Sequence, residues 1–247
     1  MNKHECITRV TVLLSLALLS IGASGQEPQP PLKHFSYEIG LKFSTLGAGI
    51  DAAVPVTHHS NLRFGFNAFN YSREERQDGI LYSGEISFRS VQATYDWFPF
   101  RGTFHLSPGL LVYNGNRLTA KASVPAGQAF TLQNTSYVSD PTNPVHGNAS
   151  VDFYKVNPMM LAGWRNLIPR MGRFEIPFEF GIIYDGTPRS FLELSGGACD
   201  PTGANCRNIS TDPTIQSNLQ FVRDQFKRKV SPFKVYPVVS VGLSFPF

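Results

Sequence analysis

The sequence has 247 residues, of which 13% are aromatic and only 16% are charged, and its formal net charge is +4. This mild positive charge does not indicate a nucleic-acid-binding protein. No phosphate-binding loop and no cluster of Cys and His occurs, so we expect neither a cofactor nor a metal. Beyond residue 25, no run approaches the 18 apolar residues of a membrane-spanning helix.

The chain begins with the features of an export signal. Lys3 and Arg9 precede the apolar run "VTVLLSLALLSIG", which the small residues "ASG" follow. This order predicts a secretory signal peptide over residues 1–25, because the run is short for a membrane anchor. Residues 26–34 form a Pro-rich leader that we expect to be extended. The remaining residues, 35–247, fit one domain.

Alternation of apolar and polar residues with a period of two then predicts strands. The first strand shows it clearly, since Tyr37, Ile39 and Leu41 alternate with Glu38 and Gly40. Eight such segments predict an all-β, antiparallel barrel. They cover residues 35–45, 46–56, 61–72, 80–98, 103–114, 151–165, 173–185 and 233–247.

Two features disturb this regular pattern. The strand 80–98 keeps a single apolar face only if a one-residue bulge lies near Arg89 and Ser90, and this bulge turns Glu85 inward. Prolines at 108, 158, 177 and 237 fall within predicted strands. A closed barrel has no free edge for a missing N–H, so these prolines require bulges or positions at the rim.

The connections alternate between short turns and long loops, as in outer-membrane barrels. A lipocalin-like barrel, with its apolar face inside, is the alternative. The polar face is too sparse in charge to face water on all eight strands, so we place it in a narrow lumen and the apolar face in lipid. The expected lumen ion-pair network comprises Glu38, Lys42, Asp51, Arg63, Glu85, Asp96, Lys155, Glu175 and Glu179.

Aromatic residues and the last strand support the membrane alternative. Tyr95, Trp97 and Phe100 surround a short turn, which is typical of an interfacial aromatic girdle. The chain ends on "YPVVSVGLSFPF", whose Phe245 and Phe247 resemble the sorting signal that the bacterial barrel-assembly machinery reads.

The mature chain as a whole resembles small eight-stranded outer-membrane barrels of the OmpA membrane-domain and OmpW class. The stretches "TLGAG", "LRFGFNAFNYS", "YDWFPF" and "KVYPVVSVGLSF" are similar to a bacterial outer-membrane family without an assigned activity. The resemblance implies a Gram-negative bacterial outer-membrane location, contacts with membrane lipids and lipopolysaccharide, and a monomeric state. It transfers no functional residue.

The last long loop, residues 186–232, carries two further features. Cys199 and Cys206 close a short Gly- and Asp-containing loop, which favours a disulfide over a metal site. A helix is predicted with Thr211 or Asp212 as its cap and Pro213 in its first turn, and an apolar stripe runs along one of its faces. Its last turns hold a basic cluster that either contacts lipopolysaccharide phosphates or is solvated. The cluster comprises Arg223, Lys227, Arg228 and Lys229.

The sequence therefore favours an outer-membrane barrel with a structural or interaction role and no enzymatic activity. One alternative is a lipid A acyl hydrolase, because His105 and Ser107 in "FHLSPG" resemble the His-x-Ser pair of outer-membrane deacylases. A nucleophilic serine also needs an acid that orients the histidine, and none follows obviously. The other alternative is passage of small solutes, as in OmpW-like barrels.

Overall fold

The computed structural model describes residues 37–100, 102–168 and 173–247. Within these ranges, no helix has both the length and the apolar character needed to cross a membrane. The predicted signal peptide and the whole Pro-rich leader lie outside the described residues.

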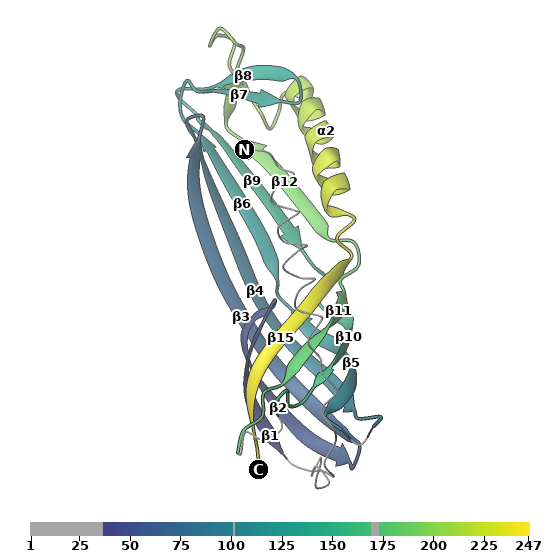
Figure 1. Cartoon of the computed structure of the whole chain (residues 1–247). Coiled ribbons are helices and arrows are strands. Elements are labelled where there is room, and N and C mark those ends of the chain that lie inside the picture. Colours follow the sequence, from purple (N-terminus) through teal and green to yellow (C-terminus); the bar gives the residue numbers. More distant parts are fainter. Residues whose placement is uncertain (1–36, 101, 169–172) are drawn as a thin grey trace, which may run out of the picture. The chain divides into compact units, whose positions relative to one another are not determined.

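Eight antiparallel strands form a closed barrel (Figure 1), which confirms the predicted fold class. The last strand pairs with the first, from Glu38↔Pro246 to Ser44↔Ser240, so the ring has no open edge. Each barrel strand overlaps one predicted segment. The strands are β1 (Glu38–Ser44), β2 (Gly47–Thr57), β3 (Ser60–Gln77), β4 (Ile80–Trp97), β5 (Phe104–Asn114), β10 (Asn157–Trp164), β11 (Phe178–Tyr184) and β15 (Val235–Pro246).

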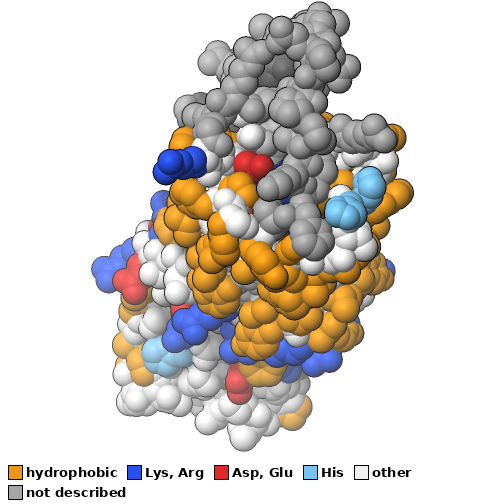
Figure 2. All heavy atoms as spheres, turned by 90° about the horizontal axis from the view of Figure 1, so that it is seen from below, with side chains coloured by type: hydrophobic (Ala, Val, Ile, Leu, Met, Phe, Trp, Pro, Cys, Tyr) orange, Lys and Arg blue, Asp and Glu red, His pale blue; other side chains and the backbone are white. Residues whose placement is uncertain are grey.

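The apolar face points outward and the polar face points inward, as predicted. Along β1, the side chains of Ile39, Leu41 and Phe43 are 55%, 56% and 70% exposed, whereas that of Lys42 is 5% exposed. Hydrophobic side chains cover broad areas of the barrel surface seen from the short-turn end (Figure 2). At that end the Trp164 ring packs against Phe104 and Phe178. The lipocalin-like alternative is therefore wrong.

The β3–β4 ladder contains no bulge. It runs without a register shift from Ser60↔Trp97 to Gln77↔Ile80, so the bulge predicted near Arg89 and Ser90 is wrong. The upper half of β4 lies beyond the barrel, where an apolar residue on the inward side need not enter a polar lumen. There the Phe88 ring packs edge-on against Tyr236 at a centroid distance of 6.2 Å.

The irregularity lies in β5 instead. Leu111 and Tyr113 pair with consecutive residues of β4, which leaves Val112 as the extra residue of a bulge. The same ladder is interrupted around Pro108, between the pairs Thr94↔Gly109 and Trp97↔Leu106. The missing N–H of Pro108 therefore falls at a gap in the ladder.

Strands β3 and β4 continue past the barrel as a long hairpin. Ala68 is the last residue of β3 that pairs with β2, yet β3 extends to Gln77, roughly 30 Å farther at the usual rise per residue. Residues 73–79, which separate the predicted strands 61–72 and 80–98, are therefore not a loop but the upper part of this hairpin and its turn. Asp78 and Gly79, with φ of 51° and 81°, make the tight turn that such hairpins favour.

The long loops are folded onto this hairpin. Three further strands extend the sheet from β4, and they are β6 (Arg117–Val124), β9 (Val145–Asp152) and β12 (Arg189–Ser195). The strand order β3-β4-β6-β9-β12 forms an outer sheet above the barrel (Figure 1). β4 thus exchanges partners, pairing with β5 inside the barrel and with β6 beyond it. The segment 151–165, predicted as one strand, is divided between β9 and β10.

A smaller sheet and one helix complete the outer part. The smaller sheet consists of β7 (Ala129–Leu132), β8 (Thr135–Ser139), β13 (Gly197–Cys199) and β14 (Arg207–Asn208). The predicted helix is confirmed as α2 (Pro213–Val230), which begins after the N-cap residue Asp212. Its Ile215 and Leu219 are buried in an apolar cluster with residues of β6, β7, β8 and β9. We call the outer sheet, the smaller sheet and α2 together the head.

Candidate functional site

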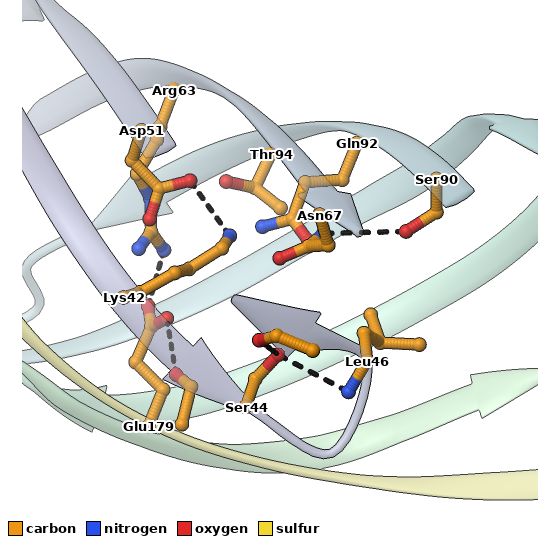
Figure 3. A network of polar contacts seen from close by, with 12 residues as sticks. Lys42, Ser44, Leu46, Asp51, Arg63, Asn67, Ser90, Gln92, Thr94 and Glu179 are labelled. Atoms are coloured by element: carbon orange, nitrogen blue, oxygen red, sulfur yellow. Dashed lines mark hydrogen bonds and ion pairs between the residues drawn. The ribbon is translucent and has the colours of Figure 1, made fainter. Parts of the chain in front are cut away.

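The middle of the lumen holds a buried network centred on Arg63 of β3. Its guanidinium binds Asp96 of β4, with an Nη2–Oδ1 distance of 3.0 Å. It also binds Glu179 of β11 (Figure 3). Glu179 accepts a second hydrogen bond from His105 of β5 at 2.9 Å and a third from Ser240 at 3.3 Å. The Glu179 carboxylate of β11 thus connects its own strand to β3, β5 and β15.

A second ion pair lies beside it. The Lys42 ammonium of β1 donates to Asp51 of β2 at 2.7 Å, and both side chains are at most 14% exposed (Figure 3). The inward residue next to the pair is Gly65 of β3. A Cβ atom there would lie 2.1 Å from Asp51 Oδ1, so the absence of a side chain makes room for the pair.

A third ionic group occupies the short-turn end. Arg165, which follows β10, binds Glu38 of β1 at 3.3 Å and also binds Glu175, which precedes β11. Arg165 and Glu38 have side chains only 7% and 14% exposed. Each cation of the lumen therefore faces at least one carboxylate, which is the condition under which buried charges persist.

Apolar side chains fill the lumen toward the long-loop end, a feature that the sequence analysis missed. Leu46, in the turn between β1 and β2, folds inward and is 2% exposed. It packs in one buried cluster with Leu111, Met159, Leu161, Ile183 and Val238. Eight strands leave an interior just wide enough for side chains. The ionic groups and this apolar cluster together form what we call the plug.

Seven of the nine residues expected in the lumen network lie there, and two do not. Glu85 and Lys155 are exposed and line a pocket on the outer face of the head, so their assignment to the lumen is wrong. Glu85 faces outward because β4 has no bulge near Ser90. Lys155 lies between β9 and β10 and places its ammonium over the Tyr113 ring. Arg165 also belongs to the lumen ionic groups but was not predicted there, and His105, predicted only as a candidate catalytic residue, joins them through Glu179.

The proposed hydrolase pair is buried in the lumen. His105 is 3% exposed and Ser107 is 0% exposed. Glu179 does orient His105, which supplies an acid that the sequence did not reveal. Among the described residues, however, the Ser107 hydroxyl has no hydrogen-bond partner, so His105 does not bind it. The arrangement lacks the contact through which a histidine activates a serine.

The remaining predicted residues lie in the head and at the end of the last strand. Cys199 and Cys206 form the predicted disulfide. In the basic cluster of α2, Arg223 donates from Nε to the Leu192 carbonyl at 2.7 Å, whereas the other three cations are exposed in the last turn. At the opposite end, Phe245 and Phe247 lie on the barrel exterior, 45% and 71% exposed.

A closed antiparallel barrel with an apolar exterior and a charged, filled lumen defines the class of small outer-membrane β-barrels. Two solved structures of CarO proteins from Acinetobacter baumannii share this fold. CarO has a TM-score of 0.53 and 18% identity, covering 87% of this chain and 99% of its own. CarO2 has a TM-score of 0.53 and 16% identity, covering 86% and 99%. These likenesses concern the fold alone.

Comparison at the level of sequence adds nothing to this assignment. No protein-family model matches the chain, and no curated protein matches it.

Proposed function

We propose that the protein is a plugged barrel of the bacterial outer membrane that holds its head rigidly at the cell surface for recognition. The observation that carries this proposal is the unbroken β3–β4 ladder, which connects the barrel to the head without a linker. A two-stranded ribbon alone is marginally stable, but here β6, β9 and β12 widen it into a sheet. The head therefore has a fixed orientation relative to the barrel wall.

The plug argues for recognition rather than passage. Arg63 links Asp96 and Glu179 from separate strands, and the Leu46 cluster fills the lumen beyond them. A solute crossing this barrel would have to displace paired buried charges as well as packed apolar side chains. The hydrolase alternative gains no support, since His105 and Ser107 are enclosed and do not bind each other.

Planar-bilayer recordings test the proposal directly. We expect the purified full-length protein to insert without producing conductance steps. A variant with Leu46→Gly and Arg63→Gly, which removes two large parts of the plug, should produce small steps, provided that it still migrates as a folded barrel on gels. Steps from the wild-type protein at neutral pH would contradict the proposal and favour the solute-passage alternative. The matched control is Arg73→Gly, which removes an exposed guanidinium from the head.

A further inference from the structure

The head carries a pocket on its outward face, at the point where β4 exchanges β5 for β6. The pocket has a volume of about 690 Å³, and β4, β5, β6, β9, β12 and the segment after β9 all contribute to its lining. Glu85 and Arg89 of β4 form one wall, because the outward side of the strand continues unbroken from the barrel into the head. The pocket therefore faces away from the lumen and toward the surroundings of the barrel.

Cations predominate in this pocket. Four cationic residues line it against two carboxylates, Glu85 and Asp152, which leaves an excess of two positive charges. Arg117 is already paired with Asp152 at 2.5 Å. Arg89, Lys155 and Arg189 have no carboxylate partner within ion-pair distance among the described residues. The pocket thus offers three cations to an anionic ligand.

Two of these cations are held in place by aromatic rings. The Lys155 ammonium lies 5.3 Å from the centre of the Tyr113 ring, and the Arg189 guanidinium lies 5.0 Å from that of Tyr154. Such contacts are favourable and limit the freedom of a long side chain, but they leave the hydrogen-bond donors free. Arginine donors match the geometry of phosphate oxygens particularly well.

The apolar belt of the barrel begins directly below the pocket. The next outward residue of β4 after Arg89 is Val91, about 7 Å along the strand, and Tyr95 and Trp97 follow on the same face. On β5, Val112 and Leu110 are 46% and 45% exposed. A ligand with an anionic head in the pocket would therefore have apolar surface beside it for its hydrocarbon tails.

We propose that this pocket binds the phosphorylated headgroup of an anionic membrane lipid, whose acyl chains lie along the outer faces of β4 and β5. The inference rests on the proposed membrane location. It assigns lipid contact to Arg89, Lys155 and Arg189 instead of the basic last turn of α2. The residues of that turn do not line this pocket, and α2 packs on the side of β12 that carries Leu192 and Leu194, opposite to Arg189.

Native mass spectrometry of the full-length protein in a neutral detergent tests this proposal. The probe is dioleoyl phosphatidic acid, compared with dioleoylglycerol, which has the same chains without phosphate, and with inorganic phosphate. The triple variant Arg89→Gln, Lys155→Gln and Arg189→Gln should bind phosphatidic acid at least about tenfold more weakly, given the strength of charge-assisted hydrogen bonds. The matched variant Lys227→Gln, Arg228→Gln and Lys229→Gln removes the same charge and should bind within about twofold of wild type.

Three results would overturn the inference. They are an equal loss in both triple variants, equal binding of dioleoylglycerol, and inorganic phosphate binding as tightly as the lipid, which would indicate a site for a free anion. If the triple variant fails to fold, the single variant Arg89→Gln should still weaken binding about threefold, and an unchanged affinity would refute the proposal. A wild-type protein that does not insert into vesicles would count instead against the proposed function.

Discussion

Lys42 and Asp51 can form their buried pair only because the neighbouring inward position is a glycine. We expect Gly65→Ala to force the pair apart, since the added methyl group would overlap Asp51 Oδ1 and approach Lys42 Nζ to 2.8 Å. Overpacking of this kind costs about 1–3 kcal/mol. The barrel should therefore lose its heat-resistant gel mobility at a lower temperature than wild type.

Gly84→Ala provides the control for this variant. The nearest atom to a Cβ at this position is the Arg73 carbonyl oxygen at 4.0 Å, so the methyl group meets no clash. Gly84 also lies in a strand interior, and the two substitutions share the same intrinsic backbone effect. Equal shifts in the two variants would show that packing against the ion pair is not the cause.

Period-two alternation predicted the inward side of most charged residues, because a strand has only two faces. It placed Lys42, Asp51 and Arg63 in the lumen without any tertiary information. It failed for Glu85, where one assumed bulge reversed the face, and for Lys155, which lies outside the strands. Partners such as Arg63 and Glu179 are 116 residues apart, and single-sequence spacing carries no information on such contacts.

At the scale of elements, strands that cross the barrel were predictable and strands beyond it were not. A strand that crosses the membrane needs one continuous apolar face, and this alternation can be recognised in the sequence. The upper half of β3 is exposed on both faces and has a polar sequence, so the pattern there is typical of a loop. Its strand conformation depends on pairing with β4, where Arg73 lies opposite Gly84 and Gln77 opposite Ile80. The helix, by contrast, was predictable from the local capping and proline signals at its start.

The start of α2 should respond to pH through its cap. Asp212 accepts hydrogen bonds from the backbone N–H groups of Ile215 and Thr214 at 3.0 Å and an ion-paired hydrogen bond from Arg207. The Ile215 hydrogen bond first, and Arg207 next, lower the pKa of Asp212 below its usual value of 3.8. This carboxylate therefore stabilises the helix above about pH 3.8, and the contribution is lost as the pH falls through the lowered pKa.

Hydrogen exchange at the first turn of α2 measures this effect. Amide protection in the wild-type protein should fall as the pH is lowered from 5 to 2, after correction for intrinsic exchange rates. Asp212→Asn keeps a capping oxygen that does not ionise in this range, so its protection should be lower at pH 5 but nearly independent of pH. Identical pH profiles for the two proteins would show that Asp212 is not the titrating group.

At the scale of the whole molecule, the apolar surface has two parts with different surroundings. Phe64, near the middle of the barrel portion of β3, is 49% exposed, and Phe191 of β12 in the head is 56% exposed. The exposed fractions of the two side chains are too similar to distinguish their surroundings. The barrel assignment does, because Phe64 lies in a continuous outward belt with Phe66 and Ile50, whereas Phe191 lies between the polar residues Arg189 and Glu193 on its face.

We therefore expect the two phenylalanines to respond differently to a positive charge. Phe64→Arg should lower the free energy of unfolding from lipid vesicles by about 2–4 kcal/mol, because the guanidinium would lie near the middle of the bilayer. Phe191→Arg should change it by no more than about 0.5 kcal/mol, because the head lies in water. Guanidinium titration followed by tryptophan fluorescence gives both values. If the two substitutions lower the free energy of unfolding by the same amount, hydrocarbon does not surround the barrel. The apolar exterior must then have another partner, such as a further protein surface.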